Sequence, residues 1–257
     1  MTVGTIVAIS NEKGGTGKTT LAVNLGAALA IRGRKTLLID MDPQGNASYI
    51  LAKITDEDPA MYSVLTDKDI GLEAVIQPTT TEHLAIAPSN LHLAGAEIQL
   101  ATLLGRENAL KRKLAPELVE RYDFVLIDTS PSLGLLTINA LNAANHALIP
   151  VSCDFLSLVG LTLLFDTIRL CQEQLGSHVQ ILGLVANRYD RREKVSAEVL
   201  DALKRQFNTL LFETVIRVNV RLKEAPSYRQ SIYEYDPVCP GAKDHLALAN
   251  ELMKKVG

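Results

Sequence analysis

A glycine-rich segment near the N-terminus carries residues suited to binding phosphate. Residues 11–20 read N-E-K-G-G-T-G-K-T-T, after an apolar run over residues 5–10 and before an Ala- and Leu-rich run over residues 21–30. Glycines let backbone N–H groups gather around an anion, and a helix that starts directly after them adds a favourable dipole. In such a loop Lys18 reaches the β- and γ-phosphates of a nucleotide, and the Thr19 hydroxyl holds Mg²⁺. The spacing therefore predicts a nucleotide-binding loop.

The loop departs from the common G-x-x-x-x-G-K-[ST] pattern at one position. The first glycine of that pattern belongs at position 12, where this chain has Glu12. A second lysine, Lys13, and two glycines, Gly14 and Gly15, stand inside the loop instead. A glycine turn with incidental lysines is the structural alternative. It explains little, because eight residues made only of lysine, glycine and threonine contribute nothing to a hydrophobic core.

Three aspartates follow apolar runs, at places where a parallel strand would end. Asp40 closes T-L-L-I-D, with Asp42 two residues further on, and Asp128 closes D-F-V-L-I-D. Acids at the carboxyl ends of strands, beside a phosphate loop, are suited to handling metal and water. Asp40 and Asp128 are predicted to hold Mg²⁺ through water, and Asp42 to orient the attacking water. The alternative for the first pair is that one acid caps the next helix.

Short apolar runs and helical patterns alternate along the chain. Strands are expected over residues 5–10, 36–40, 83–88, 123–128, 146–151, 179–186 and 210–216, and helices over residues 21–30, 63–65, 89–104, 110–121, 162–175, 196–207 and 242–255. Buried strands that alternate with helices indicate an α/β fold, with a mostly parallel, twisted sheet and helices on both faces. The pattern continues to the last residue, so we expect one domain over residues 1–257.

Composition and charge argue against several classes of protein. Apolar residues make up 47% of the 257, enough for a large core, yet no apolar run approaches the ~18 residues that span a bilayer. The first expected strand starts almost at Met1, so no signal peptide is expected. Cys153, Cys171 and Cys239 lack paired or metal-ligand spacing, which suits a reducing cytoplasm. With a net charge of −3, any contact with nucleic acid would use a local patch.

Several segments resemble one family from end to end of the chain. The run K-G-G-T-G-K-T-T, from Lys13, is similar to the deviant Walker A motif of the ParA/MinD/nitrogenase-iron-protein superfamily. The runs L-L-I-D-M-D-P-Q-G-N-A-S, from Leu37, and N-V-R-L-K-E-A-P-S, from Asn219, resemble segments of its ParA/Soj branch. The resemblance implies a P-loop NTPase that binds ATP and Mg²⁺, forms a homodimer with ATP, and hydrolyses ATP slowly.

The resemblance also implies roles for single residues. In that superfamily the extra lysine, Lys13 here, crosses the dimer interface to the partner subunit's nucleotide, and the second acid, Asp42, is required for hydrolysis; with Lys18 they are the expected catalytic residues. The loop from Asn219 lies over the adenine in the family. Asn187, at the end of an expected strand, could contact the adenine edge or form a turn. The other residues expected to bind the nucleotide are Gly14, Gly15, Thr16, Gly17, Thr19 and Thr20.

Charge is distributed unevenly along the chain. Residues 188–229 hold ten bases and six acids, a net +4, whereas the rest holds sixteen bases and twenty-three acids, a net −7. A basic segment on an acidic chain is expected where phosphates are contacted, although a solvated helix face explains it equally well. The resemblance favours sequence-nonspecific DNA binding by the ATP dimer. Arg192 and Arg221 align with arginines that contact DNA in Soj-like proteins.

The leading hypothesis is a ParA/Soj-type switch that is cytoplasmic and associated with the nucleoid. Its ATP-bound homodimer binds DNA, a ParB-like or other cargo adaptor stimulates hydrolysis, and a chromosome, plasmid or protein cargo is positioned. The motifs do not distinguish these cargoes. A MinD-like switch on a membrane surface is the alternative. It would need a basic amphipathic helix at the C-terminus, but residues 246–253 are nearly uncharged, so no membrane partner is expected. A metabolic ligase or cluster-delivery ATPase would need a substrate pocket or a cysteine pair.

Overall fold

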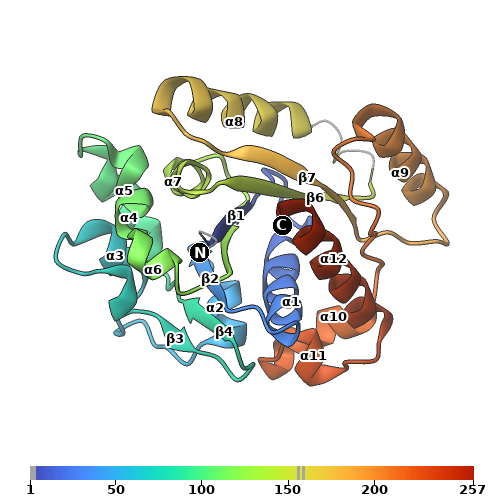
Figure 1. Cartoon of the computed structure of the whole chain (residues 1–257), viewed down its shortest axis with the longest axis horizontal. Helices are drawn as coiled ribbons and strands as arrows, with labels where there is room; N and C mark the ends of the chain where they lie inside the picture. The colour runs from blue at the N-terminus through green and yellow to red at the C-terminus, as the bar shows by residue number, and fades with distance from the viewer. Residues whose placement is uncertain (1–3, 155–156, 158–159) are drawn as a thin grey trace.

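The computed structural model describes residues 4–154, 157 and 160–257. Within these residues the strands form one sheet in the order β3-β4-β2-β5-β1-β6-β7 (Figure 1). Neighbouring strands are parallel, except that β3 is antiparallel to β4. The strands are β1 (Thr5–Ile9), β2 (Thr36–Met41), β3 (Gln77–Pro78), β4 (Leu84–Ala87), β5 (Phe124–Thr129), β6 (His146–Ser152) and β7 (Gln180–Asn187). The predicted α/β fold with a mostly parallel sheet is confirmed.

Helices cover both faces of this sheet. They are α1 (Lys18–Ile31), α2 (Asn46–Leu51), α3 (Met61–Thr66), α4 (Leu93–Ala101), α5 (Ala109–Lys113), α6 (Pro116–Val119), α7 (Leu135–Ala143), α8 (Leu161–Leu175), α9 (Lys194–Phe207), α10 (Val220–Glu224), α11 (Ile232–Tyr235) and α12 (Pro240–Val256). Successive side chains of a strand point to opposite faces. Along β1, Ile6 and Ala8 therefore pack with α3–α9, whereas Val7 and Ile9 pack with α1, α2 and α12. Figure 1 shows these layers, with α7 and α8 on one side of the sheet and α1 and α12 on the other.

The register of the three central strands brings the predicted chemical groups together. Ile9, the last residue of β1, is opposite Asp128 of β5, and Asp128 is opposite Asp40 of β2. Parallel strands end at the same edge of a sheet, which is where α/β proteins bind their ligands. The loop that follows β1 and the acids that close β2 and β5 therefore meet at this edge.

The strand predicted over residues 210–216 is wrong. The segment runs beside β7 but makes an isolated bridge to it, between Leu184 and Leu211, rather than a ladder. The backbone N–H groups of Glu213 and Thr214 instead donate to the Glu251 carboxylate of α12, at 2.7 and 2.9 Å. Since each residue has one backbone donor, these two cannot also pair with a strand.

The helix predicted over residues 110–121 is also wrong as a single element. It divides into α5 and α6, and the break falls at Leu114 and Ala115, of which Ala115 is extended with ψ of 142°. Pro116 explains the break, because proline lacks an N–H donor and forces the preceding residue out of the helical region. The same proline can begin α6, since the first N–H of a helix has no partner.

Alanine at Gly183 of β7 is expected to lower the free energy of unfolding by about 2 kcal/mol, as overpacking of a close-packed interior does. A Cβ there would lie 2.7 Å from the Phe212 ring and closer still to the Leu210 carbonyl oxygen. Urea denaturation measures the change. Gly71→Ala is the control, because its Cβ would meet only the Glu73 carboxylate at 3.8 Å. Equal losses in the two variants would contradict the packing argument.

Candidate nucleotide and metal site

The loop between β1 and α1 places backbone N–H groups at the start of a long helix. Gly15 and Gly17 have φ of +74° and +83°, in the region where a side chain is strained. Gly17 directly precedes α1, and a Cβ there would lie 2.7 Å from the Asn187 amide nitrogen. Among the described residues no side chain caps the start of α1. Its first N–H groups are therefore available to an anion.

Lys18 lies in the first turn of α1 and is 6% exposed. Within the described residues, its Nζ donates only to the Lys13 carbonyl oxygen, at 3.2 Å. Burial lowers the pKa of Lys18, while the nearby charges of Asp128 and Asp42 raise it. An ammonium group has three donors, so this one has unused hydrogen-bonding capacity that phosphate oxygens can satisfy.

Asp40 is fully buried and held by its neighbours in the next loop and helix. Its Oδ2 accepts hydrogen bonds from the Ser48 N–H at 2.9 Å and the Ser48 hydroxyl at 2.6 Å. Its Oδ1 accepts one from the Asp42 N–H at 3.1 Å. Burial raises the pKa of Asp40 to about 6, although the Ser48 hydrogen bonds act in the opposite direction. Because Ser48 is the third residue of α2, Asp40 does satisfy one free N–H of the next helix, as the capping alternative supposed.

Asp128 is fully buried beside Asp40, and neither of its carboxylate oxygens has a hydrogen-bond partner among the described residues. Burial raises its pKa well above the ordinary value, and repulsion from Asp40 adds to the effect. The Thr19 hydroxyl, in the first turn of α1, lies near enough to lower this pKa. An unpartnered buried carboxylate is costly, and a cation beside it would remove that cost.

The oxygens of Thr19, Asp40 and Asp128 are the hard ligands that suit Mg²⁺. In the part of the chain that the structure describes, no three or more His, Cys, Asp or Glu side chains cluster closely enough to hold a metal by themselves. Magnesium commonly takes only one or two protein carboxylates and completes its shell with water and phosphate. The donor set therefore fits a Mg²⁺ ion that arrives with a nucleotide.

Asp42 lies in the loop after β2 and is 5% exposed. Its Oδ1 accepts a hydrogen bond from the Gln44 N–H at 3.0 Å, which closes a turn within its own loop. It does not cap α2, since the residue before α2 is Gly45 with φ of +60°. The carboxylate is therefore held in a defined orientation next to the buried pair Asp40 and Asp128.

Lys13 makes its side-chain contacts within its own chain. Its ammonium pairs with the Asp154 carboxylate and donates to the Ser157 hydroxyl at 3.1 Å. Ser157 also donates to Asp154 through its hydroxyl, at 3.1 Å. The two lysines of the loop thus have different environments: Lys18 lies inside the loop, whereas Lys13 reaches across to the segment after β6.

A cavity of about 270 Å³ opens beside the loop, between Gly15, Gly17 and Thr20 on one side and Asn187 with residues 217–219, 222 and 223 on the other. Both asparagines expected near adenine, Asn187 and Asn219, line it. The Asn187 amide donates to the Thr16 carbonyl oxygen at 2.7 Å and its Oδ1 accepts the Arg188 N–H at 2.9 Å, so this residue holds the phosphate loop against the end of β7.

Asn219 and Arg188 complete the wall of that cavity. Asn219 caps α10 by accepting a hydrogen bond from the Arg221 N–H at 2.9 Å. Arg188 adopts a left-handed backbone, with φ of +55°, and its Nη1 donates to the Gly15 carbonyl oxygen at 2.6 Å. The chain thus closes the cavity over the phosphate loop through an arginine that the sequence pattern did not single out.

Comparison with known proteins identifies the family that shares this geometry. Residues 4–181 match a family model described as an AAA domain. Over 251 residues the chain is 44% identical to the sporulation initiation inhibitor protein Soj of Bacillus subtilis, which covers 97% of this chain and 98% of Soj. The chain belongs to the ParA/Soj family of partition ATPases. It is also 41% identical to the chromosome partitioning protein ParA of Myxococcus xanthus, over 99% of this chain and 89% of that one.

The fold of this ParA/Soj-family chain is shared with solved structures that hold nucleotide. Cobyrinic acid a,c-diamide synthase of Mycobacterium smegmatis, with a bound ATP analog and magnesium, superposes with a TM-score of 0.84. The two sequences are 32% identical, and the match covers 98% of this chain and 95% of that one. The likeness extends over the whole sheet and both helical layers.

The two arginines that the ParA/Soj resemblance assigns to DNA are each paired with carboxylates. Arg192 is 85% exposed in its side chain, and its Nε and Nη2 donate to Asp190 at 3.0 and 2.6 Å. These bonds lower the pKa of Asp190 to about 2. Arg221 pairs with Glu224 at 2.8 Å and with Asp236 at 3.4 Å. Much of the charge counted for these arginines is therefore neutralised locally.

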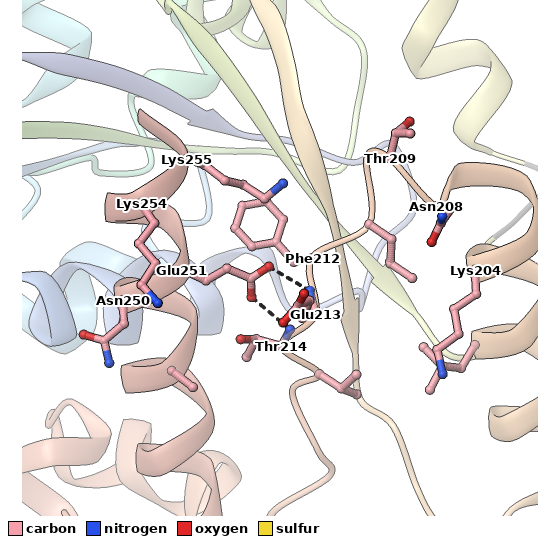
Figure 2. Close-up of a pocket in the computed structure, with 14 residues that line it drawn as sticks. Lys204, Asn208, Thr209, Phe212, Glu213, Thr214, Asn250, Glu251, Lys254 and Lys255 are labelled. Carbon is pink, nitrogen blue, oxygen red and sulfur yellow. Dashed lines mark hydrogen bonds between the residues drawn. The ribbon is translucent and has the colours of Figure 1, made fainter. Parts of the chain in front are cut away.

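A groove of about 900 Å³ between α9 and α12 carries lysines that lack such partners (Figure 2). Lys204 of α9 and Lys254 and Lys255 of α12 line it, and none of the three forms an ion pair with another described residue. Glu251 also lies there, but its carboxylate is engaged by two backbone N–H groups, as the dashed lines of Figure 2 show. Glu213 lines the groove as well, so its three lysines and two glutamates leave a small net positive charge there, away from the phosphate loop.

Proposed function

We propose that this chain is an ATP-dependent dimerising switch that binds DNA without sequence preference in its ATP state and positions a cargo. One observation carries the proposal: a two-lysine phosphate loop meets three buried acids, in a chain 44% identical to Soj over nearly its whole length. Residues 1–257 act in this proposal as one ATPase domain. A partner protein, ParB-like or a cargo adaptor, accelerates hydrolysis and so releases the DNA.

ATP and Mg²⁺ are the ligands that the site suits. The backbone of residues 14–20 and the Lys18 ammonium would hold the phosphates, and the cavity lined by Asn187 and Asn219 would take the base. Thr19, Asp40 and Asp128 would hold the metal. When bound, Mg²⁺ neutralises charge that develops on the transferred phosphoryl group.

The chain's own residues then divide the work of hydrolysis. Asp42, fixed by the Gln44 N–H, would orient the attacking water. Lys18 stabilises charge on the phosphates of its own chain. Lys13 would leave Asp154 and cross to the partner subunit's phosphates, where it acts much as an arginine finger does. The switch is thus complete only when two chains meet.

DNA retention is expected to be at least about ten-fold stronger with ATP than with ADP, because dimerisation joins two weak sites. Arg221→Glu should weaken binding by about ten-fold at ~100 mM salt, and Lys254→Glu by a similar factor, since each reverses a charge opposite phosphate. Retention on a DNA-coated surface measures both. Arg121→Glu is a matched charge reversal of another paired arginine, and it should change nothing because Arg121 belongs neither to α10 nor to the groove between α9 and α12.

The control for these variants is nucleotide binding, which should stay within about two-fold of the unaltered chain when the fold is intact. DNA binding that is equally strong with ATP, ADP and no nucleotide would contradict the proposal. Loss of DNA binding in Lys254→Glu but not in Arg221→Glu would mean that DNA contacts the groove between α9 and α12 and not α10.

Magnesium binding is expected to weaken several-fold as the pH falls from about 7.5 to about 5.5, since metal and proton compete for one carboxylate. The carboxyl concerned is Asp40, whose pKa burial raises to about 6. Without metal, ionising it costs folding free energy, so its contribution makes the protein less stable as the pH rises from about 4 to about 6. Titration of Mg²⁺ into the protein with ADP measures the first effect. The variant Asp40→Asn lacks this carboxyl and so shows how much of the pH dependence comes from titration of the nucleotide. If its magnesium affinity depended on pH as that of the unaltered chain does, Asp40 would be excluded as the group responsible.

Two other functions remain as outcomes of these tests. A membrane-surface switch would sediment with liposomes in an ATP-dependent manner and would not be retained on DNA. None of the helices described here is both long and apolar enough to cross a bilayer. A metabolic ligase would release ADP only when given an acceptor molecule. Turnover of ATP without any acceptor would exclude that function.

A further inference from the structure

Arg229 adopts a backbone that arginine seldom does. Its φ and ψ are 55° and 48°, in the left-handed region, between the short turn Ala225–Tyr228 and helix α11. Glycine takes this conformation without strain, whereas a residue with a Cβ does not. A side chain kept there needs interactions that offset the strain.

The guanidinium of Arg229 forms such interactions with the end of α2. Its Nε donates to the Tyr49 carbonyl oxygen at 2.9 Å, and its Nη2 to the Ala52 carbonyl oxygen at 2.8 Å. Its central carbon lies 4.9 Å from the centre of the Tyr49 ring. The last carbonyls of a helix lack partners within the helix and favour a cation. The planar fork of arginine can engage two of them at once, which an ammonium cannot do.

The helix held in this way carries the residue that orients Asp40. Ser48, one residue before Tyr49, directs both its N–H and its hydroxyl to Asp40. The Ser48 oxygen also accepts the Ser89 N–H at 2.7 Å, which ties α2 to the segment before α4. A shift of α2 would therefore move the hydrogen bonds that hold Asp40, together with the loop that contains Asp42.

The segment around Arg229 is anchored on its other side to the helix of the phosphate loop. The Ile232 N–H donates to the Asn24 side chain of α1 at 2.7 Å. The same segment follows α10, which Asn219 caps at the wall of the base cavity. Arg229 thus connects three parts of the site: the helix that begins at the phosphates, the segment over the base, and the loop of acids.

We propose that Arg229 is a positioning residue for ATP hydrolysis. It holds α2 against the segment that follows α10 and thereby aligns Ser48 and the loop that contains Asp42. The inference rests on the proposed ATPase function. Arg229 lies at the far end of α2 from the acids and acts through that helix, so it should affect the chemical step more than nucleotide affinity.

Three variants separate the effect of the guanidinium contacts of Arg229 from the effect of its backbone strain. Arg229→Gly removes both the guanidinium and the strained Cβ, Arg229→Ala removes only the guanidinium function, and Arg229→Lys keeps a charge that can reach one carbonyl. We expect Arg229→Gly and Arg229→Ala to lower kcat by roughly ten-fold, with KM for ATP within about two-fold. Small misplacements of catalytic groups reduce the rate more than they reduce binding. Lys should give an intermediate kcat. His83→Gly is the matched control, since His83 also has a left-handed backbone, with φ of +66°, but has its hydrogen bond with Thr36 and its ion pair with Glu82 and none with α2.

Hydrogen exchange of the nucleotide-free protein gives a second readout that does not depend on activity. Amides of residues 46–52 should exchange faster in the Gly and Ala variants, while those of residues 18–31 stay protected. Unchanged kcat in both variants, or unchanged exchange in α2, would overturn the proposal. Recovery of kcat in Gly but not in Ala would also overturn it, because strain alone would then be the cause. If the unaltered chain hydrolyses no ATP, the proposed function fails, and the exchange experiment still decides whether Arg229 holds α2.

Discussion

Replacing Asp42 by alanine is expected to lower ATP turnover by about 100-fold or more, the contribution typical of a group that handles the attacking water. Binding of ATP should change little, since Lys18 and the backbone of residues 14–20 hold the phosphates. ATP would therefore stay on the protein, and DNA retention should last longer than in the unaltered chain. Phosphate release under single-turnover conditions measures the chemical step, and retention on a DNA-coated surface measures the lifetime of the ATP state.

Asp42→Asn is the control that separates charge from loop structure. Its side-chain oxygen can still accept the Gln44 N–H that Asp42 accepts at 3.0 Å, so the turn should persist. We expect Asn to be nearly as slow as Ala. An Asn variant that hydrolyses ATP at the normal rate would mean that the turn, and not the carboxylate, is what the reaction requires.

Replacing Lys13 by alanine is expected to weaken the ATP-dependent dimer by roughly 100-fold, as the loss of a buried charge contact at an interface does. A single chain should still bind ADP or ATP within about three-fold of normal affinity, because within its own chain the Lys13 ammonium contacts Asp154 and Ser157. Sedimentation velocity with a slowly hydrolysed ATP analogue measures the dimer. Fluorescent nucleotide binding measures the single chain.

Asp154→Asn tests the same contact from the other side. It frees Lys13 from its in-chain partner but leaves the ammonium available to a second chain. Dimerisation should therefore be unchanged or stronger, in contrast to Lys13→Ala. If both variants weakened the dimer equally, the pair with Asp154 would itself be needed at the interface, and the role across the dimer would be wrong.

The site was predictable where local pattern and strand ends determine it. Strand, glycine loop and helix in succession predict a phosphate loop, and apolar runs that end in Asp40 and Asp128 place those acids at one edge of a parallel sheet. The observed register puts the two directly opposite each other. The ParA/Soj family follows from the same segments, and the comparisons confirm it.

The remaining features depend on contacts between distant segments. The N–H groups of residues 213 and 214 are taken by Glu251, nearly forty residues later, so an apolar run with strand composition forms no ladder. Arg221 is neutralised partly by Asp236, which a count of charges within one segment cannot reveal. Ser48 gains its importance only when folding brings α2 within hydrogen-bond reach of Asp40. The break before Pro116 is different, because its cause was visible in the sequence and was missed.

The two outer edges of the sheet have a consequence for how copies of the chain can associate. At one edge β3 is two residues long and contains Pro78, which has no N–H to offer. At the other edge, residues 210–216 lie along β7 with their own N–H groups partly engaged elsewhere. Neither edge is a ready template for an added strand. Chains crowded at high local concentration should therefore resist growing into fibres through their sheets, and any reversible assembly would have to use loops and side chains instead.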